Sequence, residues 1–338
     1  MKKEYSEKIP VIQFLMLLEV MLYHLELMPI REPVSAFDTW LDQLSTNMIW
    51  GHFSILCMSW FFGITAFLLF RNLSFRNLGS KLLSRVKTLL VPYILWCLIY
   101  VAKSILQGES WTLRMVFEQM FLLRIWPPLP SFWYIYAVFL LSLLSPLFLI
   151  LFHNKKIGCL STAALIILLY VFYADLHIGN GYPHYTGNIK SFFPAYIVGA
   201  YYGHIYNDET IHQDMKFLVA FLIVGCLFST AVKDLLPNMA VAVLPMLILF
   251  LLPMPEWLKS RKLYRVSFLI YATHQGIIGL TNLRIRTFLL SVIPYVSIAN
   301  ILGRILCILV IIAVNIGIHA LMTRFTPKTL KLLTGGRC

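Results

Sequence analysis

Two ionisable side chains interrupt an apolar stretch near the start of the chain. The segment "FLMLLEVMLYHL", residues 14–25, carries Glu19 and His24 among residues that would otherwise suit a lipid-facing helix. A charged side chain at the centre of a bilayer costs about 2.5–3.5 kcal/mol, so such residues usually have a function or a partner. The imidazole of histidine exchanges protons near neutral pH, which makes His24 a candidate for acid–base chemistry. A structural histidine bonded to a neighbouring helix is the alternative.

Gln13 lies on the same helical stripe as His24. It precedes His24 by eleven residues, which is nearly three turns of an α-helix. Glu19 is five residues from His24, roughly 140° around the helix, so contact between these two does not follow from the spacing. We expect Glu19 to pair with a neighbouring helix or to face a polar cavity that supports the site.

A second polar stripe lies near the other end of the chain. In "YRVSFLIYATHQGII", residues 264–278, Ser267, Tyr271 and His274 repeat at positions i, i+4 and i+7, which is one face of a helix. In lipid such a stripe must face protein or water. Two roles are open for it, the lining of a cavity and interhelical hydrogen bonds of roughly 0.6–2 kcal/mol each.

A basic segment follows the second apolar stretch. Residues 71–87 include five positive and no negative side chains, and Pro92 stands early in the next apolar run. Charged donors at this place suit an anionic, phosphate-bearing ligand. The same charges are also expected from the general excess of Lys and Arg in inner loops and from anionic lipid headgroups.

Composition indicates a membrane protein. The chain has 338 residues, of which 59% are hydrophobic and 13% charged, and its mean hydropathy is +0.77; soluble domains carry about 25% charged residues. The net charge of +13 does not indicate nucleic-acid binding, because the basic residues lie in short loops and form no basic domain. The six cysteines have no CxxC spacing, which argues against a zinc site or a disulfide framework. No metal is expected.

Apolar runs of about 20 residues predict about ten transmembrane helices in one domain that comprises residues 1–338. The runs are 9–29, 47–70, 88–107, 132–152, 157–175, 190–206, 216–233, 238–253, 265–281 and 297–322. With the N-terminus inside, 19 of the 28 Lys and Arg residues fall on the inner side and nine on the other, in agreement with the positive-inside rule. We therefore predict an all-α polytopic membrane protein with both termini in the cytoplasm.

Taken in order, these stretches resemble the membrane-bound acyltransferase-3 family of bacterial O-acyltransferases, in the branch that acetylates surface polysaccharides and related sugars. The first span of that family typically holds an arginine, ten residues and a histidine; here Gln13 and His24 occupy those places. Thr65 and Ala66 stand where the family typically has Ser and Gly. The other matching phrases are "FFGITAFLLF" (61–70), Arg85 and Lys87 before "LLVPY" (89–93), "SFWYIY" (131–136), "FFPAYIVGA" (192–200) and "SFLIYATH" (267–274).

The resemblance implies a reaction and a role for each candidate residue. Family members transfer an acyl group, usually acetyl from cytoplasmic acetyl-CoA, to a sugar hydroxyl, which implies an inner-membrane enzyme with a sugar or polysaccharide acceptor. His24 is then the expected general base, supported by Glu19. The expected CoA contacts are Arg85, Lys87 and Lys81, and the expected substrate cavity is lined by Gln13, Trp133, Ser267, Tyr271 and His274.

Two other functions stay open from the sequence. Buried Glu, His and Arg in about ten spans also suit a transporter of a sugar or another polar solute. Against a transporter, the sequence has no internal repeat and no matching pair of spans broken by Gly or Pro. The third possibility is a relative without catalytic activity that serves as a membrane scaffold.

Overall fold

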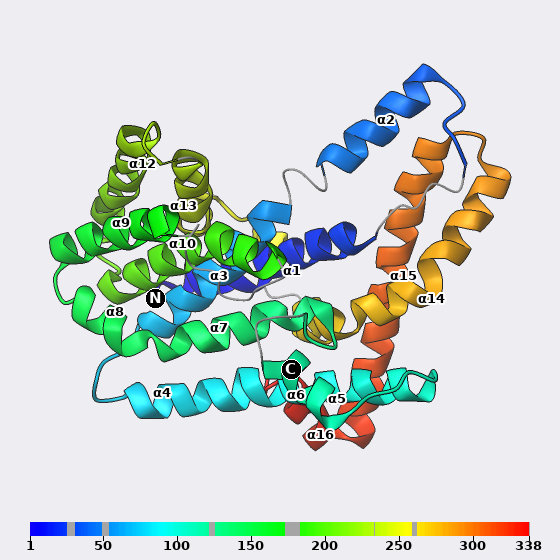
Figure 1. Cartoon of the computed structure of the whole chain (residues 1–338), viewed down its shortest axis with the longest axis horizontal. Coiled ribbons are helices and arrows are strands. Elements are labelled where there is room, and N and C mark those ends of the chain that lie inside the picture. Colours follow the sequence, from blue (N-terminus) through cyan, green and yellow to red (C-terminus); the bar gives the residue numbers. More distant parts are fainter. Residues whose placement is uncertain are drawn as a thin grey trace. The chain divides into compact units, whose positions relative to one another are not determined.

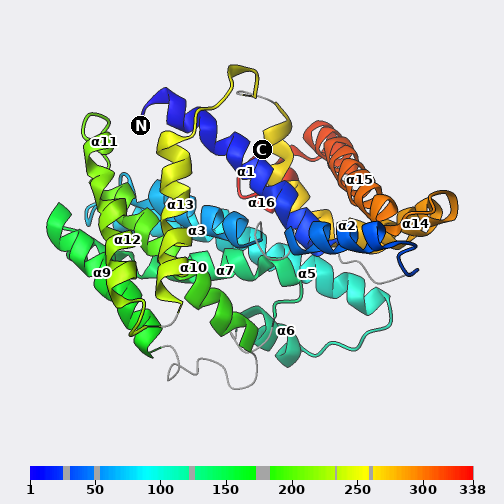
Figure 2. The same cartoon turned by 90° about the horizontal axis from the view of Figure 1, so that it is seen from above.

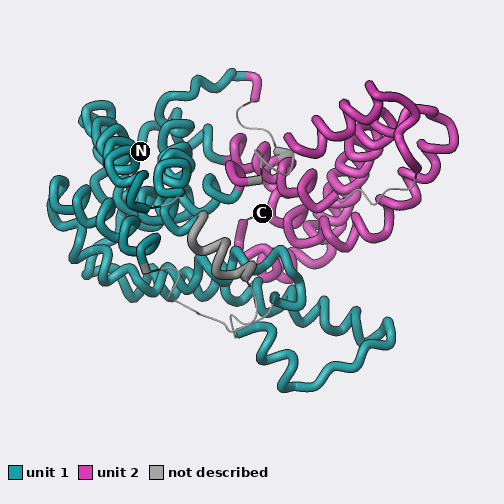
Figure 3. The backbone as a smooth tube through the Cα atoms, turned by 45° about the horizontal axis from the view of Figure 1, so that its top comes forward, with its two compact units in different colours: residues 1–9, 58–256 teal, residues 10–57, 257–338 magenta. Residues whose placement is uncertain are grey.

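The computed structural model describes residues 1–25, 31–48, 54–121, 126–172, 183–232, 234–258 and 262–337. Within those ranges the chain is helical and has no strand, which confirms the predicted helical class. The chain divides into two compact units, drawn in different colours in Figure 3. Unit 1 comprises Met1–Ile9 and Met58–Glu256, and unit 2 comprises Pro10–Cys57 and Trp257–Cys338.

Two helices contribute to both units. They are α1 (Lys3–His24), which begins in unit 1, and α3 (Ser54–Phe70), which begins in unit 2. The other helices of unit 1 are α4 (Leu78–Arg85), α5 (Val91–Leu106), α6 (Leu113–Phe121), α7 (Trp133–Leu143), α8 (Ser145–Leu151), α9 (Lys155–Phe172), α10 (Pro183–Ile205), α11 (Ile211–Asp214), α12 (Lys216–Phe228) and α13 (Leu235–Leu251). In unit 2 they are α2 (Ala36–Asn47), α14 (Ser267–Val292), α15 (Val296–Phe325) and α16 (Pro327–Leu333).

The basic segment is not the loop that the sequence predicts. From Leu78 onward it is helix α4, and a π turn, Val86–Leu90, joins it to α5. This part of the segment contains no helix-breaking proline until Pro92, so its leucines and cations continue the helix. Pro92 lacks an N–H group and crowds the preceding turn, and the wider π turn directly before it accommodates this.

A bend divides the predicted span at 132–152. Helices α7 and α8 form an angle of 53° at a break around Leu144. Pro146 lies in the first turn of α8, where its missing N–H costs no hydrogen bond but where a straight helix could not pass through it. The predicted span at 132–152 is therefore a bent pair of helices, and whether the pair crosses the membrane as one span stays a prediction.

Glycines allow α3 and α10 to approach closely within unit 1. A Cβ atom added at Gly199 would lie 2.1 Å from the carbonyl oxygen of Gly63, and one added at Gly203 would lie 2.5 Å from that of Phe67. Gly199 and Gly203 are four residues apart on one face of α10. Pairs of small residues at this spacing are typical of helices that pack closely in membranes, which gives the phrase "FFPAYIVGA" a structural reason.

Unit 2 is built on α14 and α15, which lie side by side, with α2 against α15 (Figures 1 and 2). Helix α2 does not appear among the predicted spans, because its 12 residues are too few to cross a bilayer. Its buried Asp38 accepts hydrogen bonds from the backbone N–H groups of Val296 and Ser297, in the first turn of α15. The carboxylate therefore satisfies backbone donors that a helix start leaves without partners.

The side of α2 that faces α15 is polar, and the other side is apolar. Asn300 donates to Asp42, and Arg304 donates to Ser45, while Phe37 and Trp40 are 61% and 55% exposed. A helix with its polar side inward and aromatic rings outward is typical of contact with lipid. Arg304 is buried, so its guanidinium does not extend outward to the membrane surface.

Three helical stretches within the described residues are long and apolar enough to cross a membrane, namely Leu78–Leu106, Ile211–Phe228 and Val296–Phe325. The bent pair Pro130–Leu143 and Ser145–Leu151 provides a fourth if it is counted as one span. The count of ten spans and the orientation of the termini stay predictions.

Candidate functional site

Two histidines and a glutamine meet in unit 2. His24 is the last residue of α1, and His274 and Gln275 lie in α14. The two imidazole centroids are 5.1 Å apart, with their planes tilted by 46°. The amide nitrogen of Gln275 lies 3.4 Å from Nδ1 of His24. The structure therefore brings together two predicted site residues that are 250 positions apart in the sequence.

The hydrogen bond of His274 determines its tautomer. Its Nδ1 lies 2.7 Å from the carbonyl oxygen of Tyr271, and because a carbonyl only accepts, Nδ1 carries the proton and donates it. The other nitrogen, Nε2, is then an acceptor. It is buried and has no hydrogen-bond partner among the described residues. A basic nitrogen without a partner thus belongs to the ring that adjoins His24.

Gln275 determines which nitrogen of His24 can accept a proton. In the arrangement observed, the amide N–H donates to Nδ1, so neutral His24 carries its proton on Nε2. A half-turn of the amide presents its oxygen to Nδ1, which then carries the proton and leaves Nε2 as the acceptor. Gln275 is not among the site residues predicted from the sequence, although its place directly after His274 was an available signal.

The other predicted site residues of α1 are Gln13 and Glu19. Gln13 and Glu19 are both half-buried. One carboxylate oxygen of Glu19 is buried and has no hydrogen-bond partner in the part of the chain that the structure describes. Neither a contact with His24 nor a pairing of Glu19 with another helix occurs among the described contacts.

The predicted stripe on α14 divides into two parts. Tyr271 is one turn from His274, and their ring centroids are 6.0 Å apart. Ser267 begins the helix, and its hydroxyl donates to the carbonyl of Tyr264 over 2.8 Å. Tyr271 therefore adjoins the histidine pair, whereas the hydroxyl of Ser267 is used at the start of the helix.

The predicted CoA contacts lie on one continuous helical segment of unit 1. Arg85 is half-buried, and its Nη2 donates to the carbonyl oxygen of Thr65 over 3.3 Å. Lys81 lies one turn before it, and Lys87 lies in the π turn after it. Neither lysine forms an ion pair within the described ranges. Three cations therefore follow one another within two turns of helix.

Thr65 keeps a hydroxyl group where the family typically has serine. Its Oγ1 lies 2.8 Å from the phenol oxygen of Tyr134, and that phenol donates to the carbonyl of Phe61. The phenol's proton is used in the second bond, so Thr65 is the donor in the first. Tyr134 is therefore directed at α3.

Trp133 packs among other aromatic rings of unit 1. Its ring centroid lies 5.8 Å from that of Phe62, 6.2 Å from that of Phe192 and 6.2 Å from that of Trp126. These contacts hold a half-buried indole at the start of α7.

In the described part of the chain, no group of three or more His, Cys, Asp or Glu side chains has a geometry suited to a metal ion.

Comparison with known proteins identifies the family. No curated protein and no solved structure matches the chain. The family model described as an acyltransferase domain matches residues 8–320, a range that includes His24, Arg85, Trp133 and His274. With this match over most of its length, and with helices apolar enough to cross a membrane, the chain belongs to the acyltransferase-3 family of membrane acyltransferases.

Proposed function

We propose that the chain is an O-acetyltransferase of the cytoplasmic (inner) membrane, which moves an acetyl group from acetyl-CoA to a hydroxyl of a surface-polysaccharide or lipid-linked sugar. The observation that carries this proposal is the pairing of His24 with His274 and Gln275 in a chain of the acyltransferase-3 family. A sugar hydroxyl is a weak nucleophile and needs a base, which an imidazole supplies near neutral pH.

The proposed reaction balances without an added metal or redox partner. The sugar oxygen forms a bond to the thioester carbonyl carbon, and the bond from that carbon to the CoA sulfur breaks. His24 accepts the hydroxyl proton and returns it to the sulfur, so the products are the acetyl ester and the CoA thiol. In the arrangement observed, the amide N–H of Gln275 lies at Nδ1 of His24. Gln275 supports the proposed role after a half-turn of its amide, when the amide oxygen accepts the proton of Nδ1 and leaves Nε2 as the base.

The donor is assigned to the cations of unit 1. Acetyl-CoA carries several phosphate charges, and a guanidinium group offers a planar set of donors that suits phosphate. Arg85 uses one N–H group on Thr65, which orients the guanidinium. Lys81 and Lys87 add charge on the same helical segment. Tyr271 is assigned to the polar lining beside the histidine pair, and Gln13 and Glu19 are assigned to supporting positions on α1.

The test combines donor binding, CoA release and acceptor acetylation. Purified protein should bind acetyl-CoA and release CoA slowly without an acceptor. The His24→Gln variant should fold and bind acetyl-CoA normally but lose acceptor acetylation by about 10²- to 10⁴-fold, the usual contribution of a positioned acid–base group. His153→Gln is the matched control, since His153 is exposed and lies in unit 1.

Two outcomes would count against the proposal. Absence of both acetyl-CoA binding and CoA release in folded wild-type protein would remove the acetyltransferase assignment. Near-normal acetylation by a well-folded His24→Gln variant would remove His24 from the mechanism, and the base would then be assigned to His274, whose Nε2 is an acceptor.

A further inference from the structure

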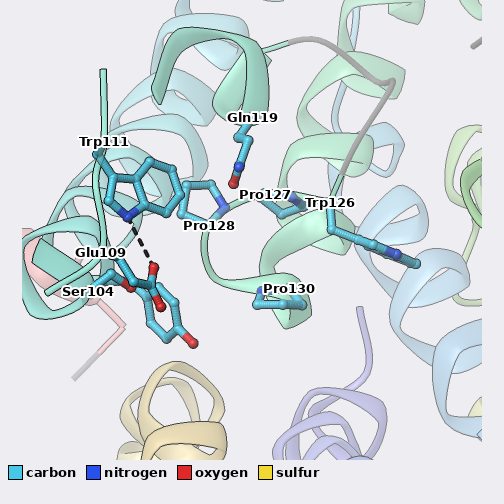
Figure 4. A pocket seen from close by; sticks show the side chains of 9 residues that line it. Ser104, Glu109, Trp111, Gln119, Trp126, Pro127, Pro128 and Pro130 are labelled. Atoms are coloured by element: carbon cyan, nitrogen blue, oxygen red, sulfur yellow. Dashed lines mark hydrogen bonds between the residues drawn. The ribbon is translucent and has the colours of Figure 1, made fainter. Parts of the chain in front are cut away.

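A pocket lies at the C-terminal end of α5 in unit 1. Its volume is about 330 Å³, at the lower end of the range of small-molecule sites. Tyr100 and Ser104 of α5 contribute to it, together with Glu109 and Trp111 of the following connection. Gln119 of α6 and the segment from Trp126 to Pro130 complete it. In Figure 4 the proline side chains lie between the indoles of Trp111 and Trp126.

The lining combines aromatic faces with uncharged and acidic hydrogen-bonding groups. Trp111, Trp126 and Tyr100 supply flat apolar surface. Gln119 both donates and accepts, and Ser104 does the same, whereas Glu109 only accepts. Alternating C–H and O–H groups on a sugar ring require this combination of a flat apolar surface and in-plane hydrogen bonds.

One hydrogen bond arranges the carboxylate for a ligand. The indole nitrogen of Trp111 donates to Oε2 of Glu109 over 3.2 Å, as the dashed line in Figure 4 marks. A carboxylate accepts at about four lone-pair positions, so this bond orients Glu109 without exhausting it. Among the residues that the structure describes, the lining contains no Lys or Arg, and the carboxylate of Glu109 would repel phosphate, so the chemistry favours a neutral polyhydroxyl ligand.

Prolines form a rigid wall of the pocket, and the pocket adjoins Trp133, which the sequence predicts as a cavity residue. Pro127 and Pro128 are buried and Pro130 completes the wall, and proline rings have little freedom to lose when a ligand binds. The ring of Trp126, which also lines the pocket, lies edge-on to that of Trp133, with centroids 6.2 Å apart and planes at 73°. The pocket thus adjoins the one site residue predicted for the start of α7.

The pocket and Arg85 occupy opposite ends of one helical segment. Ser104 follows Arg85 by 19 residues, roughly 28 Å along the helix. The hydrocarbon core of a bilayer is about 30 Å thick. A pocket at this end therefore lies across the membrane from the cations assigned to acetyl-CoA.

From this chemistry and placement we propose that the pocket binds a neutral sugar ring of the acceptor, on the membrane face opposite Arg85. The inference rests on the proposed acetyltransferase function, because that function supplies the reason for a sugar at this place. It names the recognition site of the acceptor, and it makes Trp111, Trp126 and Glu109 specificity-determining residues.

The experiment measures the binding of methyl glycosides of glucose, galactose, rhamnose and N-acetylglucosamine to the purified full chain. Saturation-transfer NMR reports which ring protons contact the protein, and titration gives the affinity. The detergent must have no sugar headgroup, since a maltoside would compete. Trp111→Ala should weaken binding of the preferred glycoside by roughly five- to tenfold. Trp111→Phe, which keeps an aromatic face, should retain most of the affinity.

Matched variants separate the pocket from general effects. Glu109→Gln keeps the size of the side chain and should weaken binding by roughly tenfold. Trp257→Ala removes a 67% exposed tryptophan outside the pocket and should leave binding unchanged. In the transfer assay the pocket variants should raise KM for the glycoside while kcat and KM for acetyl-CoA stay at wild-type values.

The outcomes distinguish the pocket from the proposed function. Glycoside binding that is weakened in Trp111→Ala but not in Trp257→Ala supports the pocket even if no acetyl transfer is found, and only the proposed function then fails. If folded Trp111→Ala and Glu109→Gln variants transfer acetyl groups with a wild-type KM for the glycoside, the proposed sugar pocket is wrong. The proposed acetyltransferase function is not contradicted by that result. The proposed sugar pocket is also wrong if the wild-type protein acetylates a polymer but binds none of the four glycosides.

Discussion

At the scale of single residues, the imidazoles of His24 and His274 form a pair in which each ring has a different set of partners. His274 donates through Nδ1 to a backbone carbonyl and is fully buried, so its tautomer is set by the helix that carries it. His24 is only half-buried and has the amide of Gln275 at Nδ1, a partner that can accept or donate. Of the two rings, His24 is therefore the one whose proton can change position without a change of backbone.

Gln275 provides a test of this difference. Gln275→Leu removes the partner of Nδ1, and we expect kcat for acetyl transfer to fall by about tenfold or more, with KM for acetyl-CoA unchanged, because base catalysis depends on a defined tautomer. Gln275→Glu should keep or restore activity, since a carboxylate oxygen accepts the Nδ1 proton. Steady-state kinetics on purified variants is the measurement.

A glutamine outside the site serves as the control for the Gln275→Leu variant. Gln213 is exposed on α11 in unit 1, and Gln213→Leu should behave as wild type. If Gln275→Leu kept its full kcat, or if Gln275→Glu were as inactive as the leucine variant, the amide would have no positioning role.

At the scale of elements, the connection between α2 and α15 depends on the ionised form of one carboxyl group. Burial raises the pKa of Asp38, but hydrogen bonds from the side chain and backbone of Ser297 and from the backbones of Val34 and Val296 oppose it, and together they lower the pKa to about 2. A carboxyl group whose native pKa lies below its ordinary value contributes stability above that ordinary value, near pH 4. That contribution is lost as the pH falls toward the native pKa.

Asp38→Asn tests this contribution. The amide can no longer accept at both positions, so hydrogen-bond donors of Val296 and Ser297 lose charged acceptors. We expect Tm at neutral pH to fall by roughly 5 °C. The difference from wild type should shrink as the pH is lowered from about 4 toward 2. Thermal unfolding across this pH range is the measurement, and a difference that stays constant would contradict the assignment.

Substitution of glycine by alanine should change stability in opposite directions at the close contact of α3 and α10 and at an open position of α14. Gly199→Ala places a methyl group where the carbonyl of Gly63 lies, so the helices must separate, and overpacking of this kind costs about 1–3 kcal/mol. Gly279→Ala in α14 meets nothing within 4 Å and should stabilise the chain by about 0.5–1 kcal/mol through helix propensity. Thermal unfolding and yield after size-exclusion chromatography measure both.

The test depends on the opposite signs of the stability changes in Gly199→Ala and Gly279→Ala. If both alanine variants were equally stable, α3 and α10 would not be held at the separation that the glycines allow. Gly203→Ala should resemble Gly199→Ala, because its added Cβ would also meet backbone, at Phe67.

At the scale of the whole molecule, orientation in the membrane is the main prediction. The excess of basic residues predicts that Arg76 lies on the cytoplasmic side, and the segment Leu78–Leu106 then carries the chain across. Arg76→Cys and Ser110→Cys, both at exposed positions, should therefore react with an impermeant maleimide from opposite sides of sealed vesicles of known orientation. The parent chain measures the background from native cysteines, and labelling of both positions from one side would refute the topology.

The sequence by itself determined the helical class, the family and two polar stripes, because hydropathy and helical periodicity are local properties. An apolar run predicts a helix wherever it packs. The positions of Gln13, Glu19 and His24 on one helix followed from their spacing, as did those of Tyr271 and His274 on another. The ordered set of motifs from residue 13 to residue 274 was sufficient to suggest the family that the match over residues 8–320 identifies.

The tertiary structure alone decided which stripes meet. A polar stripe shows which side of a helix avoids lipid, but the neighbour on that side depends on helix crossings between distant parts of the chain. The contact of His24 with Gln275, the orientation of α2 with its polar side against α15, and the convergence of Trp111 and Trp126 on one pocket are all of this kind. The same reason applies to Gly199, since only the backbone of a second helix explains why a side chain cannot be placed there.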